Sequence, residues 1–165
     1  MKKHASYILL SAFCSVLLIL ADRVTKAAAV RHLKDQEPIR LIRGVLELKY
    51  LENHGAAFGM LQNKQTLFFI LTVAVLGLIL FFFLFRIPQG RKYMPLNIMC
   101  ILLFSGAIGN FIDRITQSYV VDFIYFSLID FPIFNVADCY VSVSAVLLFV
   151  LILFFYKEED LKGIL

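Results

Sequence analysis

Four long apolar segments separate the charged regions of this chain and limit what it can fold into. They cover residues 5–21, 67–85, 94–112 and 139–156, and a helix of about 20 mainly apolar residues can cross the hydrocarbon core of a bilayer. Hydrophobic residues make up 61% of the 165 and charged residues only 17%, whereas a soluble domain is about a quarter charged. We therefore expect an all-α integral membrane protein, a single membrane domain over residues 1–165 with four transmembrane helices.

The first apolar segment follows two lysines and so begins like a cleaved signal peptide. No A-x-A-like cleavage site precedes Asp22, and three further apolar segments follow, so a retained first helix is the better interpretation. Four spans put both termini on one side of the membrane. The loops 22–66 and 113–138 then share the other side.

The orientation follows from the short basic segments. Loop 22–66 itself carries eight Lys and Arg residues, so a total count does not decide the matter. Lys2, Lys3 and the tight turn that contains Arg86, Arg91 and Lys92 are typical of cytoplasmic segments under the positive-inside rule. We therefore expect both termini and this turn in the cytoplasm, and the two longer loops outside.

The long loop has structure of its own. Leu46, Leu48 and Tyr50 alternate with charged residues, which is the period of a half-buried strand, and Ile39 and Leu41 begin a similar run. These patterns predict a small β-sheet on the outer membrane surface. Residues 27–34 are predicted to form a short interfacial helix.

Two classes of protein are disfavoured by composition. The three cysteines form no C-x-x-C pair and have no histidine at ligand spacing, so we expect neither a disulfide framework, nor a metal site, nor a cofactor. The net charge of +4 comes from dispersed basic residues without a nucleic-acid motif, and anionic membrane lipid is the expected partner instead of nucleic acid.

Charged and small residues gather at the ends of the first and third spans. Asp22 and Lys26 are four residues apart, and their plainest interpretation is an ion pair at a helix end. Gly106 and Asn110 have the same spacing, and the Asp-Arg pair at 113 and 114 continues that face. Small residues there permit close helix packing, so this group alone identifies no function.

Asp122 and Asp138 have apolar neighbours and no basic residue nearby in sequence. Asp138 is open to a second interpretation as the N-cap of the last span, whereas Asp122 is not. Two carboxylates brought together in a low-dielectric site share a proton, so that one acts as base and the other as acid on a bound water. This is the chemistry of aspartic peptide hydrolysis.

Five motifs in a fixed order give the chain a specific resemblance. They are "ADRVTK", "ENHGAAFG", "GAIGNFIDR", "VVDFI" and "FNVADCYV", and they extend over nearly the whole sequence. In this combination the chain resembles the lipoprotein signal peptidase family, signal peptidase II. The resemblance implies a bacterial inner-membrane aspartic endopeptidase, expected as a monomer, that removes signal peptides from diacylglyceryl-modified prolipoproteins just before the lipidated cysteine, with its active site at the outer face.

The resemblance also assigns roles to individual residues. It places the catalytic dyad on Asp122 and Asp138. Asn53, Asn135 and Arg114 are candidates to hold the substrate backbone or the dyad. The full set of substrate-binding or supporting positions is Asp22, Lys26, Asn53, Gly55, Gly106, Asn110, Asp113, Arg114, Asn135 and Ala137. Two departures from the family pattern are a short segment between the dyad members and Cys139, where a small polar residue is expected.

Two other classes of function compete with a peptidase. A small transporter or proton-relay subunit would use the same carboxylates to bind a cation or proton, but the spans show no discontinuous half-helices and their middles lack charge. A non-catalytic assembly factor would use the face formed by Gly106 and Gly109. Cleavage of a lipidated precursor by the purified protein separates all three.

Overall fold

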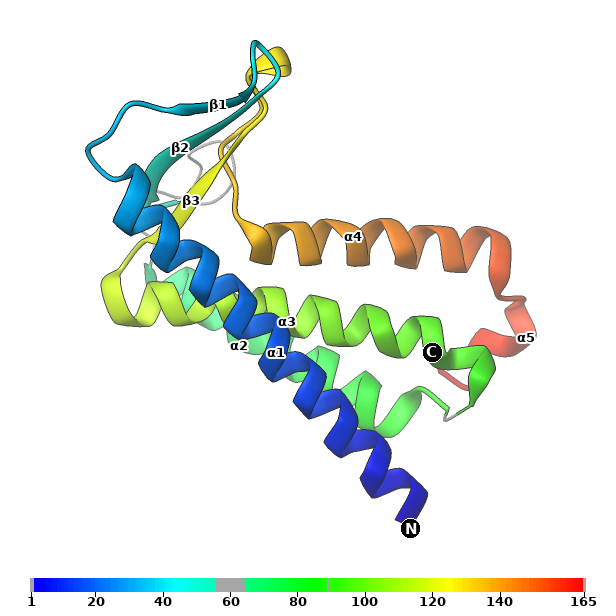
Figure 1. Cartoon of the computed structure of the whole chain (residues 1–165). Coiled ribbons are helices and arrows are strands. Elements are labelled where there is room, and N and C mark those ends of the chain that lie inside the picture. The colour runs from blue at the N-terminus through cyan, green and yellow to red at the C-terminus, as the bar shows by residue number, and fades with distance from the viewer. Residues whose placement is uncertain (1, 56–64, 89, 165) are drawn as a thin grey trace.

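Four long helices form the body of the protein, and a small sheet projects from one end of them (Figure 1). The structure is a computed structural model and describes residues 2–55, 65–88 and 90–164. The helices are α1 (Lys2–Leu33), α2 (Gln65–Phe81), α3 (Met94–Gln117) and α4 (Val136–Val150), with π-helical turns continuing α2 through Phe82–Arg86 and α4 through Leu151–Phe155, and a short α5 (Glu158–Leu161) near the end of the chain.

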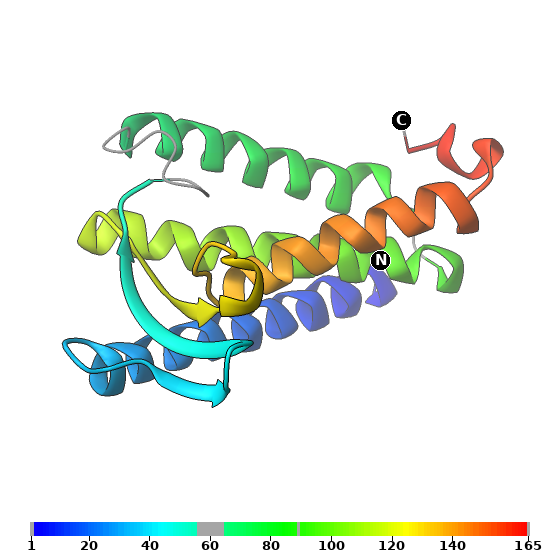
Figure 2. The ribbon, with the colours of Figure 1, turned by 90° about the horizontal axis from the view of Figure 1, so that it is seen from above.

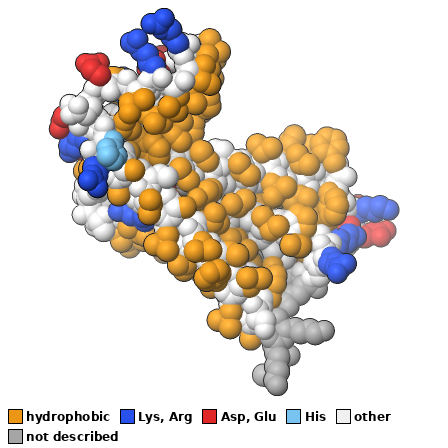
Figure 3. All heavy atoms as spheres, viewed as in Figure 1, with side chains coloured by type: hydrophobic (Ala, Val, Ile, Leu, Met, Phe, Trp, Pro, Cys, Tyr) orange, Lys and Arg blue, Asp and Glu red, His pale blue; other side chains and the backbone are white. Residues whose placement is uncertain are grey.

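The four helices are built for a bilayer. Within the described residues, four helices are long and apolar enough to cross a membrane: Ala5–Leu33, Phe69–Arg86, Arg91–Gln117 and Val136–Phe155. Large apolar side chains remain exposed along them, and hydrophobic atoms cover most of the bundle in Figure 3. Lipid is the solvent that makes such a surface stable, so the prediction of a four-span membrane protein is confirmed.

Helix α3 is the centre of the bundle and packs against each of the other three long helices. Figure 2 shows α1 and α2 on opposite sides of it. Helix α4 comes especially close, because a Cβ on Gly106 would lie only 2.5 Å from the carbonyl oxygen of Ala137. A glycine at this position therefore lets α3 and α4 approach at the end of the bundle that carries the sheet.

The sheet has three antiparallel strands in the order β1 (Ile39–Ile42), β2 (Leu46–Asn53), β3 (Val120–Tyr125). The first two strands were predicted from their alternating pattern and are confirmed. Gly44, with φ of 71°, makes the turn between them in the left-handed region that favours glycine. The third strand was not predicted. Its pairing with β2 joins the two loops that flank the central spans.

Several element bounds differ from those expected. Residues 27–34 are helical through Leu33 but form the last turns of α1 instead of a separate interfacial helix, so Asp22 lies inside a helix. Helix α3 continues to Gln117, and α4 begins at Val136. The loops are consequently shorter than 22–66 and 113–138, and residues 56–64 of the first lie outside the described residues. Continuous helices keep backbone groups paired where the chain leaves the membrane.

Strand β3 rests on the end of α1. Val121 and Phe123 of the strand form a buried apolar cluster with Ala29 and Leu33 of the helix. Since side chains alternate across a strand, Asp122 points to the face opposite its two neighbours. This packing aims the carboxylate of Asp122 toward Asn135 at the start of α4.

Candidate active site

One asparagine residue donates hydrogen bonds to both candidate catalytic carboxylates. Asn135 Nδ2 donates to Asp122 Oδ1 at 2.6 Å, and the backbone N–H of Asn135 donates to Asp138 Oδ2 at 3.1 Å. The side chain of Asn135 is completely buried. Sequence spacing alone gave no contact between Asp122 and Asp138, whereas in the structure both carboxylates contact Asn135.

The position of Asp138 follows from the way α4 begins. Asn135 is the N-cap, and its side-chain oxygen accepts from the backbone N–H of Asp138 at 3.1 Å, while Asp138 accepts in return from the backbone of Asn135. This is a capping box, in which the third helical residue reaches back to the cap. The interpretation of Asp138 as the N-cap itself was therefore wrong, because Asn135 takes that place. The positive end of α4 also favours negative charge here.

Asn110 of α3 orients Asp138 from the other side. Its Nδ2 donates to Asp138 Oδ1 at 2.7 Å, and its Oδ1 accepts from both Lys26 Nζ at 2.8 Å and Asn135 Nδ2 at 3.1 Å. An amide that receives two donors on its oxygen can present only its nitrogen to a third partner. Lys26 and Asn135 thus fix the amide so that it donates to the carboxylate.

A buried ion cluster supports this arrangement. Lys26 Nζ lies 2.9 Å from a carboxylate oxygen of both Asp22 and Asp113, and Arg23 forms a further ion pair with Asp113. The side chains of Asp22, Lys26 and Asp113 are almost completely inaccessible. The predicted ion pair between Asp22 and Lys26 is confirmed, but it lies inside α1 instead of at a helix end, and Asp113 joins it. Removing one member would leave an unpaired buried charge, which typically costs about 3–5 kcal/mol.

The ion cluster also holds the start of α4. Asp22 Oδ1 accepts from the backbone N–H of Ala137 at 3.0 Å, and a Cβ on Gly109 would lie 2.6 Å from Asp22 Oδ2. The carboxylate therefore fits only because α3 has a glycine beside it. Helices α1, α3 and α4 are joined by this single side chain.

The third set of contacts reaches the loop after β2. Asn53 Nδ2 donates to Asp122 Oδ2 at 2.8 Å, and Asn53 Oδ1 accepts from the backbone N–H of Gly55 at 3.0 Å. The carbonyl of Gly55 accepts in turn from Arg114 at 3.2 Å. Asp122 consequently receives an amide donor on each of its oxygens, one from Asn53 and one from Asn135.

The electrostatic environment of Asp122 suits acid-base chemistry. Burial raises the pKa of Asp122 to about 7, and the nearby charge of Asp138 adds to the rise against the hydrogen bonds from Asn53 and Asn135. A carboxyl group with a pKa near neutrality both releases and accepts a proton under physiological conditions. Such a shift in a carboxylate pair is a recognised sign of a functional site.

All twelve residues predicted for the site lie in this one connected network. Sequence reasoning missed Arg23, the partner of Asp113, and gave Gly109 only a packing role, although both lie within the quoted motifs. Within residues 2–55, 65–88 and 90–164, the structure shows no group of three or more His, Cys, Asp or Glu side chains able to hold a metal ion. The donors around the carboxylates are amides, a lysine and two arginines.

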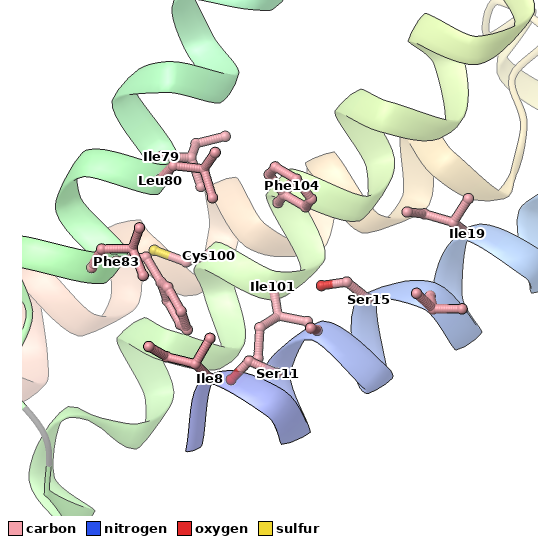
Figure 4. Close-up of a pocket in the computed structure, with 13 residues that line it drawn as sticks. Ile8, Ser11, Ser15, Ile19, Ile79, Leu80, Phe83, Cys100, Ile101 and Phe104 are labelled. Carbon is pink, nitrogen blue, oxygen red and sulfur yellow. The ribbon is translucent and has the colours of Figure 1, made fainter. Parts of the chain in front are cut away.

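A separate cavity of about 370 Å³ lies between α1, α2 and α3 (Figure 4). None of the twelve site residues lines it. Its walls are apolar side chains such as Ile8, Phe83 and Phe104, with the hydroxyl groups of Ser11 and Ser15 on one side. Cys100 is the one titratable side chain among its lining residues, which include no carboxylate or histidine, so the carboxylate network is the better candidate for a reactive site.

Four membrane-spanning helices with a buried carboxylate pair at one end define a multi-pass membrane protein whose polar site lies at one end of its spans. Comparison with known proteins narrows this class. The family model described as signal peptidase (SPase) II matches residues 14–154. The chain belongs to the signal peptidase II family, and it is therefore a membrane-embedded peptidase.

Individual relatives agree over most of their length. A lipoprotein signal peptidase of Streptococcus thermophilus (strain CNRZ 1066) is 45% identical over 143 residues, 87% of this chain and 90% of the relative. One from Streptococcus pyogenes serotype M1 is 40% identical over 145 residues, 88% of this chain and 91% of the relative. A bacterial membrane enzyme solved in meso at 2.3 Å resolution has a TM-score of 0.81 at 35% identity, with 89% of each chain covered.

Proposed function

We propose that this protein is an aspartic endopeptidase that removes the signal peptide from diacylglyceryl-modified prolipoproteins, just before the lipidated cysteine. Asp122 and Asp138 form the catalytic dyad. The observation that carries the proposal is the shared contact of both carboxylates with Asn135, together with the pKa of about 7 for Asp122. Two groups that hold one proton between them can serve as acid and base in turn.

The proposed reaction starts with one proton shared by the two carboxylates, so that one is ionised and the other protonated. The ionised carboxylate takes a proton from a water molecule, whose oxygen attacks the scissile carbonyl carbon, while the protonated carboxyl gives its proton to the carbonyl oxygen. When the tetrahedral intermediate collapses, the C–N bond breaks and the leaving nitrogen receives the proton that came from water. A hydroxyl of the intermediate returns the other proton, and the dyad regains its starting state.

The supporting residues divide into two kinds under this proposal. Asn53, Asn110 and Asn135 orient the carboxylates through amide donors and leave no freedom for the side chains to turn away. Asp22 and Lys26 act at one remove, since they hold Asn110 and the first turn of α4 in place. Preorganised groups of this kind lower the barrier because they need no rearrangement in the transition state.

The apolar surface beside the site suits a substrate that stays in the membrane. Hydrophobic side chains form a continuous surface from the sheet to the spans in Figure 3, and α4 exposes Val143, Val146 and Phe149 beyond Asp138. A signal-peptide helix and acyl chains remain in lipid while the bond to be cut reaches the rim, where water enters. Lipid-facing surface is therefore useful to the reaction as well as to insertion.

The proposal includes an orientation in the bacterial inner membrane. With both termini in the cytoplasm, the sheet and the dyad lie at the outer face, where lipidated precursors are presented. Single cysteines at Gln36 and Gly90 in a cysteine-free variant test this with a membrane-impermeant thiol reagent on whole cells. Gln36→Cys should react and Gly90→Cys should not, and the reverse pattern would contradict the orientation.

Turnover of a lipidated precursor by purified variants tests the dyad. Asp122→Asn and Asp138→Asn keep the shape of each side chain but remove its proton chemistry, and each should abolish cleavage, since acid-base groups that act as a unit fail together. Asp113→Asn is the matched control, because it changes a buried aspartate of the same network that contacts Lys26 instead of Asn135. Its effect should fall mainly on stability or substrate affinity.

Folding of each variant is checked by membrane insertion and by a single peak on size exclusion. Appreciable turnover by folded Asp122→Asn or Asp138→Asn protein would refute the mechanism. A folded Asp113→Asn variant that binds precursor normally but does not cleave it would show that the wrong carboxylate had been chosen.

A further inference from the structure

The far end of the sheet carries apolar side chains that no other described part of the chain covers. We call residues 126–131, with the β1–β2 turn (residues 42–46) beside them, the sheet tip. Leu128 and Ile129 of the sheet tip are 68% and 69% exposed, and Phe126 and Phe131 are also exposed. Contiguous exposed apolar groups of this size on a membrane protein mark a surface that meets either lipid or another protein.

The position of the sheet tip favours lipid. The sheet projects sideways from the bundle, and the tip folds back toward the start of α4, so that along the bundle axis it lies level with that helix end and not beyond α1 (Figures 1 and 2). In Figure 3 the hydrophobic surface of the projection faces α4 and continues onto the spans. The tip therefore overhangs the lipid that surrounds α4.

The charges around the sheet tip fit the headgroup region of a bilayer. Arg40, Arg43 and Lys49 are exposed, and Figure 3 shows basic side chains gathered at the far end of the projection. Two acidic groups share this end. Asp130 accepts a hydrogen bond from the hydroxyl of Tyr125 at 2.6 Å, and Glu47 is half-buried. Exposed cations beside apolar side chains are typical of segments that lie in the membrane interface.

We propose that the sheet tip inserts into the leaflet on the sheet's side of the membrane, with Leu128 and Ile129 among the upper acyl chains and the three basic residues at the lipid phosphates. Strand β3 carries Asp122 and runs directly into the sheet tip. The inserted sheet tip holds one end of this strand at the bilayer, and the spans hold the other end. Together they fix the depth of Asp122 relative to the bilayer surface. This inference rests on the fold and the membrane spans, not on the dyad mechanism.

The absence of tryptophan from the sequence allows a direct test. Leu128→Trp protein is reconstituted into phosphatidylcholine vesicles whose acyl chains are brominated either near the headgroup or near the chain end. The indole emission should shift to the blue, and the shallow bromines should quench it more strongly than the deep ones. Gln36→Trp is the control, since this exposed residue lies in the loop between α1 and β1, and its emission should stay unshifted and unquenched.

Ile129→Trp, at the adjacent position, repeats the test if the first variant folds poorly, and inserted, monodisperse protein is required in each case. Emission from both variants that matches the control would overturn the proposal. A blue shift without quenching would also overturn it, because it would mean that a protein surface, such as a second copy of the chain, covers the tip. Activity is not part of the readout, so failure here is distinct from failure of the proposed mechanism.

Discussion

Replacing Asp122 by Asn should change the stability of the folded protein more favourably at alkaline pH than in acid. The pKa of this carboxyl is raised by burial, so the folded state keeps the proton after the unfolded chain has lost it. Below about pH 4 both states are protonated and Asp122 imposes no penalty; stability is lost as pH rises from about 4 to about 7, and the full penalty remains above that range.

The size of the effect follows from the two pKa values. The difference between 3.8 for an ordinary aspartate and about 7 in the folded protein corresponds to about 4 kcal/mol. Asparagine has the shape of the neutral carboxyl and no charge to bury, so Asp122→Asn removes this penalty. Its NH2 group cannot accept one of the two amide hydrogen bonds, and that loss applies equally at every pH. For a chain of this length 1 kcal/mol shifts the Tm by about 2–4 °C, which sets an upper bound of about 8–16 °C at about pH 8.

Differential scanning calorimetry in detergent measures this shift at both pH values, because it reads the heat of unfolding and needs no reactive group on the protein. Asp35→Asn is the control, since this exposed residue has no buried charge to remove and its Tm should not change with pH relative to the parent. A Tm difference between Asp122→Asn and the parent that is the same at about pH 4 and about pH 8 would refute the reasoning.

Three further outcomes are expected. Gly106→Ala should lower the free energy of unfolding by about 1–3 kcal/mol in the same thermal assay, because its Cβ would meet the carbonyl of Ala137. Gly77→Ala is the control, since its Cβ would meet nothing within 4 Å and its stability should not fall. Equal losses for the two variants would contradict the close helix contact. Cleavage rate plotted against pH should fall on the alkaline side near pH 7 as the dyad loses its shared proton, and again in acid as it takes a second one, with both apparent pKa values belonging to the pair; a rate that rises steadily through pH 8 would contradict the shared proton. Cleavage should survive chelators and replacement of Cys14, Cys100 and Cys139 by Ala or Ser, and activity that chelators abolish and zinc restores would point to a metallopeptidase.

The elements that show a local pattern of apolar residues in the sequence were predictable. Apolar runs of spanning length gave the four helices, and alternation over residues 46–50 gave β2. These signals are local, because a helix or strand that meets lipid or a core shows it in the period of its own side chains. Strand β3 was missed because Val120 and Val121 are both buried, which removes the alternation that identifies a strand.

The residues proposed for the site were also found from the sequence, but only through motifs that occur in a fixed order along the chain. Local spacing placed Asp22 in an ion pair with Lys26 and made Asp138 a helix cap. Spacing gave no reason to connect Asp22 with Ala137, which lies 115 positions later and donates to it. A hydrogen bond between such distant residues produces no periodic pattern in the sequence of either segment.

Tertiary structure alone decided how the carboxylates are held. The close approach of α3 and α4 at Gly106 brings Asn110 beside Asp138, and the packing of β3 on α1 turns Asp122 toward Asn135. Burial in that setting, and not the residue type, raises the pKa of Asp122 to about 7. The sequence determined which side chains the membrane would have to accommodate, whereas the energy of each charge depends on distances and solvent exclusion that exist only once the helices and the sheet have come together.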